Sequence, residues 1–351
     1  MKKILFVTTA LIATASVASA EVRISGYGRF GIDYNDGNSR TVASAGPGGL
    51  QTALGVPIPT SSTNITSRLR LQFDMSTETD SGVTFGARFR AQAESRDNIP
   101  GGAFFNGARF FASYEGFQLL VGNIIGAIEN TPGLYLETRT ADIGIDGAGF
   151  ESIVANVNAE SFNWDSYSSG GTGANGVEVI YSANGFVGHL SYSTNNGAIA
   201  ADRFAVMGSY NFGDWTVALS AQSSDTLWED KVVFSVAGDL GQFGVRLAYA
   251  DNDGISKVGL YGNMDIGAAG NLVAYVTDEG AVDAADVVAG RNDNRDVNAD
   301  PLGIAATNGG EGTGYGINYS YDLGGGATFI AGFRRASDDN NTAQAGVYFS
   351  F

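Results

Sequence analysis

The sequence has no cysteine and only one histidine. Without cysteine there is no disulfide framework, no thiolate metal site and no cysteine nucleophile. A single histidine leaves few routes to histidine-based catalysis or to a zinc site built from several imidazoles. A Gly-x-Ser-x-Gly elbow and a Gly-Lys phosphate-binding loop are also missing. Carboxylates are too numerous to single out an acid–base pair, so the sequence offers no identifiable catalytic centre.

Positive charge is scarce as well. The chain has 20 Lys and Arg against 37 Asp and Glu, a net charge of −17 at pH 7 and a pI near 4.3. Nucleic-acid binding needs basic surface, so no nucleic-acid partner is expected. Glycine is abundant instead, 50 in 351 residues, but without the Gly-X-Y period of collagen. The apolar content of 44% is ordinary for a folded chain.

The first twenty residues have the three parts of a secretory signal peptide. Lys2 and Lys3 provide a positive start, residues 4–15 form an apolar stretch, and Ala18-Ser19-Ala20 is a small-residue cleavage site. A membrane anchor is the alternative, but the stretch is too short to span a bilayer. We expect residues 21–351 to form one mature domain. Removal of Lys2 and Lys3 leaves 18 of the 20 basic residues against 37 acidic ones.

No later apolar run reaches the roughly 18 residues that a transmembrane helix needs. The longest, residues 117–128, is interrupted by Asn123. Apolar and polar residues alternate instead with period 2, which is typical of strands with one apolar face. Each strand is about ten residues long, enough for a tilted strand to cross a bilayer core. The clearest alternating segments are residues 69–75, 83–91, 177–181, 204–212, 215–219, 243–249, 258–266, 315–321 and 347–351.

Tight turns recur between these segments. Asn184-Gly185 is a strong hairpin signal, because a type I′ turn needs positive φ at both central positions. Aromatic residues lie beside the short turns, as at a membrane interface. The other short turns fall at residues 115–116, 213–214, 240–241, 267–270 and 324–326, and the longer, more polar loops are residues 35–63, 128–174 and 281–312.

Short turns on one side and long loops on the other are typical of an outer-membrane barrel. We count sixteen strands, an even number that allows the first strand to pair with the last. That pairing predicts that the ammonium of Glu21 lies beside the carboxylate of Phe351. A soluble β-sandwich or lectin is the alternative, but its loops need no side preference. The sequence therefore predicts an all-β fold, a 16-stranded antiparallel transmembrane β-barrel.

Several segments resemble the general diffusion porins of the Rhodobacter type. They are residues 21–26 (EVRISG), 67–71 (SRLRL) with 79–86 (TDSGVTFG), 319–327 (YSYDLGGGA) and the terminal 347–351 (VYFSF). The resemblance implies a homotrimer in the outer membrane of a Gram-negative bacterium. It also implies a constriction in each barrel, made by a third loop folded into the lumen. The loop sequences do not identify which solute passes through the pore.

A positive wall for such a constriction is predicted from strand parity. Arg29, Arg70 and Arg90 alternate with outward apolar residues and lie eight or nine residues from the short-turn end. At roughly 3.3 Å per residue and a tilt near 40°, they sit at one height, about 20 Å up the wall. Facing lipid instead would cost about 2–4 kcal/mol each. The predicted wall comprises Arg29, Arg70, Arg90, Arg68 and Arg88, and the alternative is that these form lumen salt bridges with Asp74, Glu78 and Glu94.

The third long loop supplies the opposite charge, with Arg139 as its only cation. Its apolar residues, such as Leu134-Tyr135-Leu136, are expected to pack on the wall while its carboxylates face the arginines. The resulting transverse field would orient dipolar solutes and disfavour apolar ones. A solvated surface loop is the alternative. The predicted acidic residues are Glu129, Glu137, Asp142, Asp146 and Glu151.

Two stretches have spacings of oxygen ligands reminiscent of calcium loops. They contain Asp142 and Asp146, and Asp296, Asn298 and Asp300. Neither carries the full pattern with its distal glutamate. The prediction is no cofactor, with calcium as the alternative.

These observations predict an outer-membrane pore for passive diffusion of small hydrophilic solutes and ions through a charged eyelet. The alternatives are a substrate-selective porin, which would need a line of aromatic side chains along the lumen, and an outer-membrane barrel enzyme, which would need a catalytic site. The expected partners are further copies of the chain, outer-membrane lipid and small solutes. Residues 117–128, apolar on both faces, are expected to touch the third loop inside and a neighbouring subunit outside. Few aromatics have inward parity: Tyr27, Phe111, Tyr261 and Tyr348.

Overall fold

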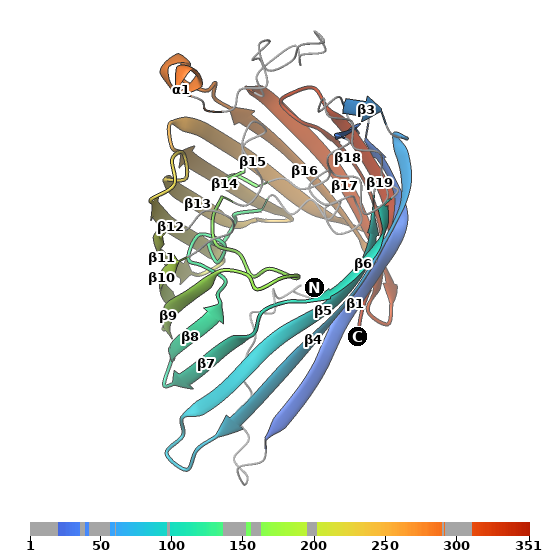
Figure 1. The fold of residues 1–351 in the computed structure, drawn as a ribbon. Coiled ribbons are helices and arrows are strands. Elements are labelled where there is room, and N and C mark those ends of the chain that lie inside the picture. The colour runs from blue at the N-terminus through green and yellow to red at the C-terminus, as the bar shows by residue number, and fades with distance from the viewer. Residues whose placement is uncertain are drawn as a thin grey trace.

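The computed structural model describes residues 20–35, 39–41, 57–59, 61–96, 99–135, 152–155, 163–194, 202–289, 291 and 311–351. One antiparallel sheet closes on itself, and a two-stranded hairpin and a short helix lie outside it (Figure 1). The elements are β1 (Glu21–Asn35), β2 (Ser39–Thr41), β3 (Pro57–Pro59), β4 (Thr63–Glu78), β5 (Thr84–Arg96), β6 (Ile99–Phe105), β7 (Arg109–Tyr114), β8 (Phe117–Asn123), β9 (Asn175–Ala183), β10 (Phe186–Thr194), β11 (Arg203–Phe212), β12 (Trp215–Ser224), β13 (Lys231–Leu240), β14 (Phe243–Asn252), β15 (Ile255–Ile266), β16 (Gly270–Glu279), α1 (Ala284–Val288), β17 (Gly312–Gly324), β18 (Ala327–Arg335) and β19 (Asn341–Ser350).

The sheet is a ring, because β1 pairs with β4 on one side and with β19 on the other. β6 and β7 both pair with β5, so they form one barrel strand that is interrupted at residues 106–108. Counted this way, the described residues form sixteen barrel strands, each antiparallel to its neighbours. Closure matters because lipid offers no hydrogen-bond partners to an open strand edge. The predicted 16-stranded barrel is confirmed.

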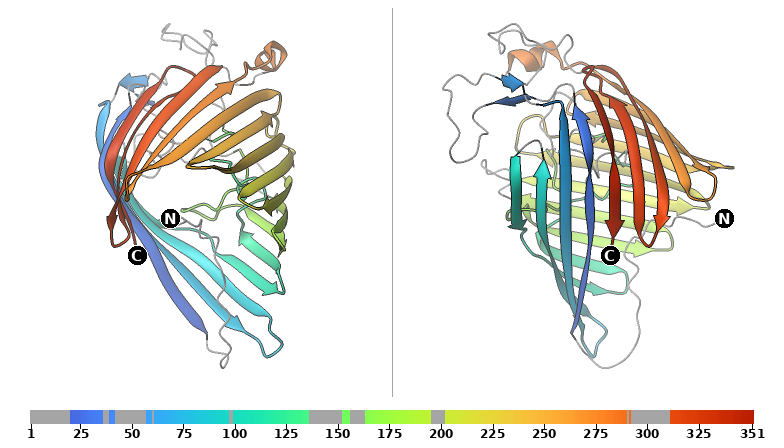
Figure 2. Two further views of the ribbon diagram at one scale, coloured as in Figure 1. Left: turned by 180° about the vertical axis from the view of Figure 1, so that it is seen from behind. Right: turned by 90° about the vertical axis from the view of Figure 1, so that its right-hand side faces the viewer.

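The short turns lie where the sequence predicts them, at one end of the barrel. In the turn between β9 and β10, Asn184 and Gly185 have φ of 49° and 83°, the two positive values that the predicted type I′ turn requires. The C-terminus and the β4–β5 turn lie at this end, whereas α1 and the β2–β3 hairpin lie at the other (Figure 2). The opposite connections vary in length, and β14 and β15 are joined by the two residues Asp253 and Gly254.

The outer surface of the barrel is apolar. Alternate residues are exposed along many of the strands, as in β11, where Phe204 and Val206 face outward and Ala205 and Met207 are buried. Large rings beside the short turns are also exposed, including Tyr114, which is 48% exposed, and the predicted aromatic girdle is therefore on the outside. Among the described residues, no helix is long and apolar enough to cross a membrane.

Two details differ from the sequence predictions. Phe351 exchanges backbone hydrogen bonds of 2.9 and 3.0 Å with Gly26, whereas Glu21 lies opposite Ser76. The first residues of β1 therefore extend past the C-terminus. The first and last strands pair as predicted, but the predicted contact between the Glu21 ammonium and the Phe351 carboxylate is wrong. The apolar segment 117–128 is also not one strand. β8 ends at Asn123, and the residues that follow belong to the third loop, which accounts for their apolar character on both parities.

Candidate functional site in the barrel interior

The third loop begins at residue 124 and turns into the barrel. Its described parts, residues 124–135, 152–155 and 163–174, lie inside the ring of strands (Figure 1). Gly126 has φ of +81°, and a Cβ there would lie 2.7 Å from atoms of Asp165, so glycine is required where the two arms of the loop meet. The predicted inward fold of this loop is present.

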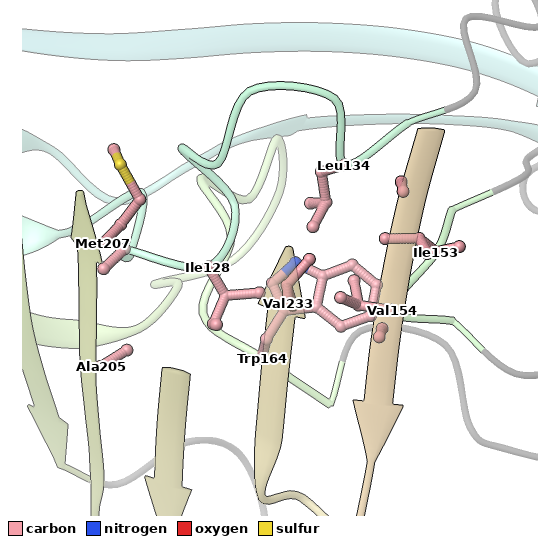
Figure 3. Close-up of a cluster of buried hydrophobic side chains, with 11 residues drawn as sticks. Ile128, Leu134, Ile153, Val154, Trp164, Ala205, Met207 and Val233 are labelled. Atoms are coloured by element: carbon pink, nitrogen blue, oxygen red, sulfur yellow. The ribbon is translucent and has the colours of Figure 1, made fainter. Parts of the chain in front are cut away.

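An apolar cluster attaches the loop to the wall. Trp164 lies between loop residues and strand residues and is 1% exposed (Figure 3). Full burial of a Leu, Ile or Val side chain contributes about 1.5–3 kcal/mol, so this cluster is a substantial reason for the inward fold. The cluster members are Ala127, Ile128, Leu134, Ile153, Val154 and Trp164 from the loop and Ala205, Met207, Val233, Ala248 and Ala250 from β11, β13 and β14.

A buried carboxylate fixes the start of the loop. Glu178 on β9 is 1% exposed and accepts a hydrogen bond of 3.0 Å from the backbone N–H of Gly126. It also pairs with Arg109 on β7 and lies 3.0 Å from Nε2 of His189 on β10. The buried charge is thus compensated by three different elements, as a buried carboxylate requires. His189 faces the interior and lies beneath the loop, where its Nδ1 is 3.3 Å from the Asn130 side chain.

The predicted arginines lie on three neighbouring strands, β1, β4 and β5. Arg29 is opposite Arg68, and Arg70 is opposite Gln92, two residues from Arg90. Relative to the residue opposite the preceding arginine, Arg70 and Arg90 each lie two residues closer to the short-turn end of their strand. The short turns are offset in the same direction. Phe117, which follows the β7–β8 turn, lies opposite Tyr181, which is three residues before the β9–β10 turn at Asn184. Because both follow the strand tilt, the arginines remain near one level.

These arginines differ in their partners. Arg68 pairs with Glu94 and Arg88 pairs with Asp74, each with a closest distance of 2.5 Å, so these two arginines form the salt bridges that were the alternative to a free positive wall. Arg70 donates to the Gln92 side chain at 2.8 Å and lies over the ring of Tyr27. Arg29 is 3% exposed.

Among the described residues, the partners of Arg90 are all neutral. Its guanidinium lies 4.4 Å from the centroid of the Tyr167 ring and 3.3–3.5 Å from the Gln72 side chain, the Tyr167 carbonyl and the Ser169 hydroxyl. No carboxylate among the described residues is within ion-pair distance of it. Tyr167 and Ser169 belong to the returning arm of the loop, so Arg90 is where the arginine wall meets the loop.

The interrupted barrel strand is where that returning arm joins the wall. Asn106 accepts a hydrogen bond of 2.5 Å from the backbone N–H of Arg90 and donates one of 2.5 Å to the Ser168 carbonyl. The Gly107 N–H donates to the Gly171 carbonyl at 2.7 Å. The gap between β6 and β7 therefore lets loop backbone take the place of ladder hydrogen bonds next to Arg90.

One predicted acidic residue, Glu129, is described. Its carboxylate accepts hydrogen bonds from the Tyr135 hydroxyl at 2.5 Å and from Trp164 Nε1 at 2.8 Å. Burial raises the pKa of Glu129 to about 7, although both hydrogen bonds and the positive charge of Arg90 act to lower it. Glu129 therefore changes charge near neutral pH, within electrostatic reach of the arginine wall.

The remaining predicted site residues lie outside the described residues. They are Glu137, Asp142, Asp146 and Glu151 of the acidic set and the calcium candidates Asp142, Asp146, Asp296, Asn298 and Asp300. In the part of the chain that the structure describes, no cluster of three His, Cys, Asp or Glu residues is placed to hold a metal ion.

Comparison with known proteins agrees with this architecture. The family model for Gram-negative porins matches residues 7–341 of the chain. The chain belongs to the Gram-negative porin family. Porins of Fuscovulum blasticum and Rhodobacter capsulatus are each 28% identical to it over 94% of this chain and 100% of theirs. An engineered triple mutant of Rhodopseudomonas blastica porin has a TM-score of 0.69 and 25% identity, again over 94% of this chain and 100% of that one.

This porin is thus an outer-membrane pore for passive diffusion, and its strands cross the membrane many times. The resemblance noted in the sequence is confirmed. Sequence reasoning did not single out Glu178, Tyr167 or Trp164 as loop anchors, because their roles depend on contacts between distant segments. The usable signal was the inward parity of Glu178 between outward Val177 and Val179.

Proposed function

We propose that the pore narrows to a charged eyelet between the arginines of β1, β4 and β5 and the folded-in loop. The observation that carries this proposal is Arg90, whose charge meets loop atoms and no described carboxylate at ion-pair distance. Arg70 and Arg88 lie close enough for their charges to act on Arg90. A positive wall at the narrowest point raises the local concentration of small anions, within a screening length of about 8 Å.

The combined variant Arg29→Gln, Arg70→Gln and Arg90→Gln tests the eyelet. We expect its reversal potential in a salt gradient to shift toward cations, because three positive charges leave the proposed wall. Arg335→Gln is the control, because Arg335 pairs with the exposed Asp339 at the far end of β18. Removing Glu137, Asp142 and Asp146 should shift selectivity toward anions. Unchanged reversal potentials in both triple variants would place the eyelet elsewhere.

Small hydrophilic solutes fit this interior better than one selected sugar. Tyr27 and Tyr348 stack at 5.1 Å beside Arg70, which gives a short aromatic pair. Tyr261, another predicted lumen aromatic, is 5% exposed and covered by Arg246 instead. A channel also fits better than an enzyme, because the His189–Glu178 pair is buried against the loop, away from the open lumen.

We further propose that the porin assembles as a homotrimer through the outer face of β1, β4, β5 and β6. A groove of about 460 Å³ opens there, lined by small residues such as Gly28, Ala93 and Ala103 between Phe30 and Leu69. Small outward residues allow the backbones of two barrels to approach closely, as they do at other protein contacts in membranes.

A bulky ring in the groove tests the trimer. We expect Ala93→Trp to shift the assembly toward folded monomers in mild detergent, because the ring fills space that the neighbouring subunit needs. Ala221→Trp on β12 is the matched control, at an outward position far from the groove. A monodisperse, fully folded monomer of the unaltered protein would contradict the proposal.

A further inference from the structure

Lys231 and Lys257 are the only lysines after residue 20, and each is 2% exposed. A buried ammonium group is rare, because removing a charge from water is costly unless strong partners replace the solvent. Both occupy inward positions, Lys231 at the start of β13 and Lys257 on β15. Neither belongs to the arginine wall, so their burial calls for a different role.

Both ammonium groups reach the same short piece of the third loop. Lys257 Nζ donates to the Ala155 carbonyl at 2.7 Å, and Lys231 Nζ lies 3.4 Å from the Val154 carbonyl. On β14, between the two lysine strands, Asn252 Nδ2 donates to the Ile153 carbonyl at 3.1 Å. Three consecutive loop carbonyls are therefore bound from three consecutive barrel strands.

The surroundings compensate the two charges differently. Lys257 Nζ lies 3.3 Å from Oε2 of Glu279, whose side chain is 1% exposed. Lys231 Nζ lies 5.8 Å from the centroid of the Trp164 ring, within the range of a cation–π contact. Trp164 is itself a loop residue, so Lys231 contacts both the backbone of the loop, at Val154, and one of its side chains.

The bound segment, residues 153–155, is a second place where two parts of the loop meet, in addition to the contact between Gly126 and Asp165. The Ile153 N–H donates to the Leu134 carbonyl at 3.0 Å, and the Ser152 hydroxyl donates to the same carbonyl at 2.9 Å. Arg246 on β14 donates to the Tyr135 carbonyl at 2.8 Å. The wall thus fixes the chain on both sides of residues 136–151, which contain four of the five predicted acidic residues.

We propose that Lys231, Asn252 and Lys257 are positioning residues that form a latch, seating the third loop against β13–β15 and keeping the pore steadily open. The bond from Lys257 Nζ to the Ala155 carbonyl, at 2.7 Å, has the length of a charge-assisted hydrogen bond, which is stronger than a neutral one. All three latch residues contact loop backbone, and Lys231 contacts the Trp164 ring as well. The inference rests on the pore and the inward loop, and not on which charges line the eyelet.

Two latch variants, assembled as full chains in planar bilayers, test the latch. Lys231→Met keeps the aliphatic stem, and Lys257→Met combined with Glu279→Gln avoids leaving a buried carboxylate alone. We expect closing transitions at fixed voltage to become about tenfold more frequent in both, or ~1.4 kcal/mol, the scale of one hydrogen bond to a charged group. Arg335→Met, which removes a cation with a 36% exposed side chain, should leave the frequency unchanged.

Acetylation of the folded assemblies gives a second readout that does not depend on a variant folding. We expect acetic anhydride to modify Lys231 and Lys257 at least a hundredfold more slowly than in the denatured chain. Lys231 should react about tenfold faster when Lys257→Met and Glu279→Gln are present, because a loosened loop exposes it.

Rapid labelling of both lysines in conducting assemblies would overturn the latch. Unchanged closing frequency in both latch variants would overturn it as well. A shifted reversal potential with unchanged closing would also reject the latch, and it would leave the eyelet proposal standing, because selectivity and closure are measured separately.

Discussion

The two sides of the lumen use inward-facing positions in opposite ways. On β4 and β5 these positions carry arginines such as Arg70, Arg88 and Arg90, which remain partly exposed. On β13 and β14 they carry Val233 and Ala248, both 0% exposed beneath the loop. Strand parity is the same on both sides. The difference is that water faces the first wall and folded chain faces the second.

Charge is therefore tolerated differently on the two walls. Arg90 on the first wall is partly exposed, and its partners among the described residues are neutral. A charge beneath the loop has lost its water and must be paired. Arg203 on β11, for example, bonds Glu229 at 2.7 Å and Asp165 of the loop at 3.2 Å. The arginines of β1, β4 and β5 are available to set ion selectivity because the loop is held by apolar packing on the opposite wall, at β11, β13 and β14.

The largest effect is expected from Trp164→Ala, which empties the centre of the packed wall. Such a large-to-small change in a core costs about 4 kcal/mol, since the cavity adds to the lost burial. The loop should leave the wall, and single-channel recordings should become noisy while the barrel still assembles. Phe212→Ala, at an outward ring that is 48% exposed, is the control and should leave channel noise unchanged. Quiet channels from Trp164→Ala would mean that the loop does not depend on this cluster.

Replacing an arginine by glutamine should mainly reduce stability on the packed wall and mainly change ion selectivity on the arginine wall. Arg203→Gln leaves Asp165 and Glu229 buried without their cation, so we expect a loss of about 3 kcal/mol in stability, measured as earlier thermal dissociation of the assembly. Arg90→Gln should leave thermal stability nearly unchanged and shift the reversal potential toward cations. If both variants behaved alike, the contrast between the walls would be wrong.

A smaller effect is expected from pH. Because the folded pKa of Glu129 is raised to about 7, its contribution to stability is greatest at acidic pH and is lost as pH rises through 7. Its negative charge appears over the same interval, so reversal potentials should shift toward cations between pH 6 and pH 8. Glu129→Gln should remove this titration. A shift that survives the substitution would assign it to another group.

The smallest effect is expected at the exposed pair of Arg335 and Asp339, which lie 2.6 Å apart beyond the packed wall. Exposed ion pairs contribute about 0–1 kcal/mol, so Asp339→Ala should change the melting temperature little and the conductance not at all. A loss comparable to that of Arg203→Gln would show that exposure does not control the cost of breaking an ion pair here.

Much of the barrel was predictable because its signals are local. Period-2 alternation fixes which residues face lipid, and Asn184-Gly185 fixes a turn through the φ values that only a few residues adopt easily. Parity likewise placed Arg70, Arg88 and Arg90 on the lumen side, and the chain ends resembled a known family. Each of these conclusions depends on residues close together in the chain.

Register and loop contacts needed the tertiary structure. The offset that places Phe351 beside Gly26, rather than beside Glu21, depends on the tilt accumulated around sixteen strands. The charge state of Glu129 depends on Trp164, which lies 35 residues away in the sequence. The sequence by itself determined which face each side chain occupies. The tertiary structure decided which inward faces meet water and which meet the loop, because burial is set by contacts between distant segments and not by local pattern.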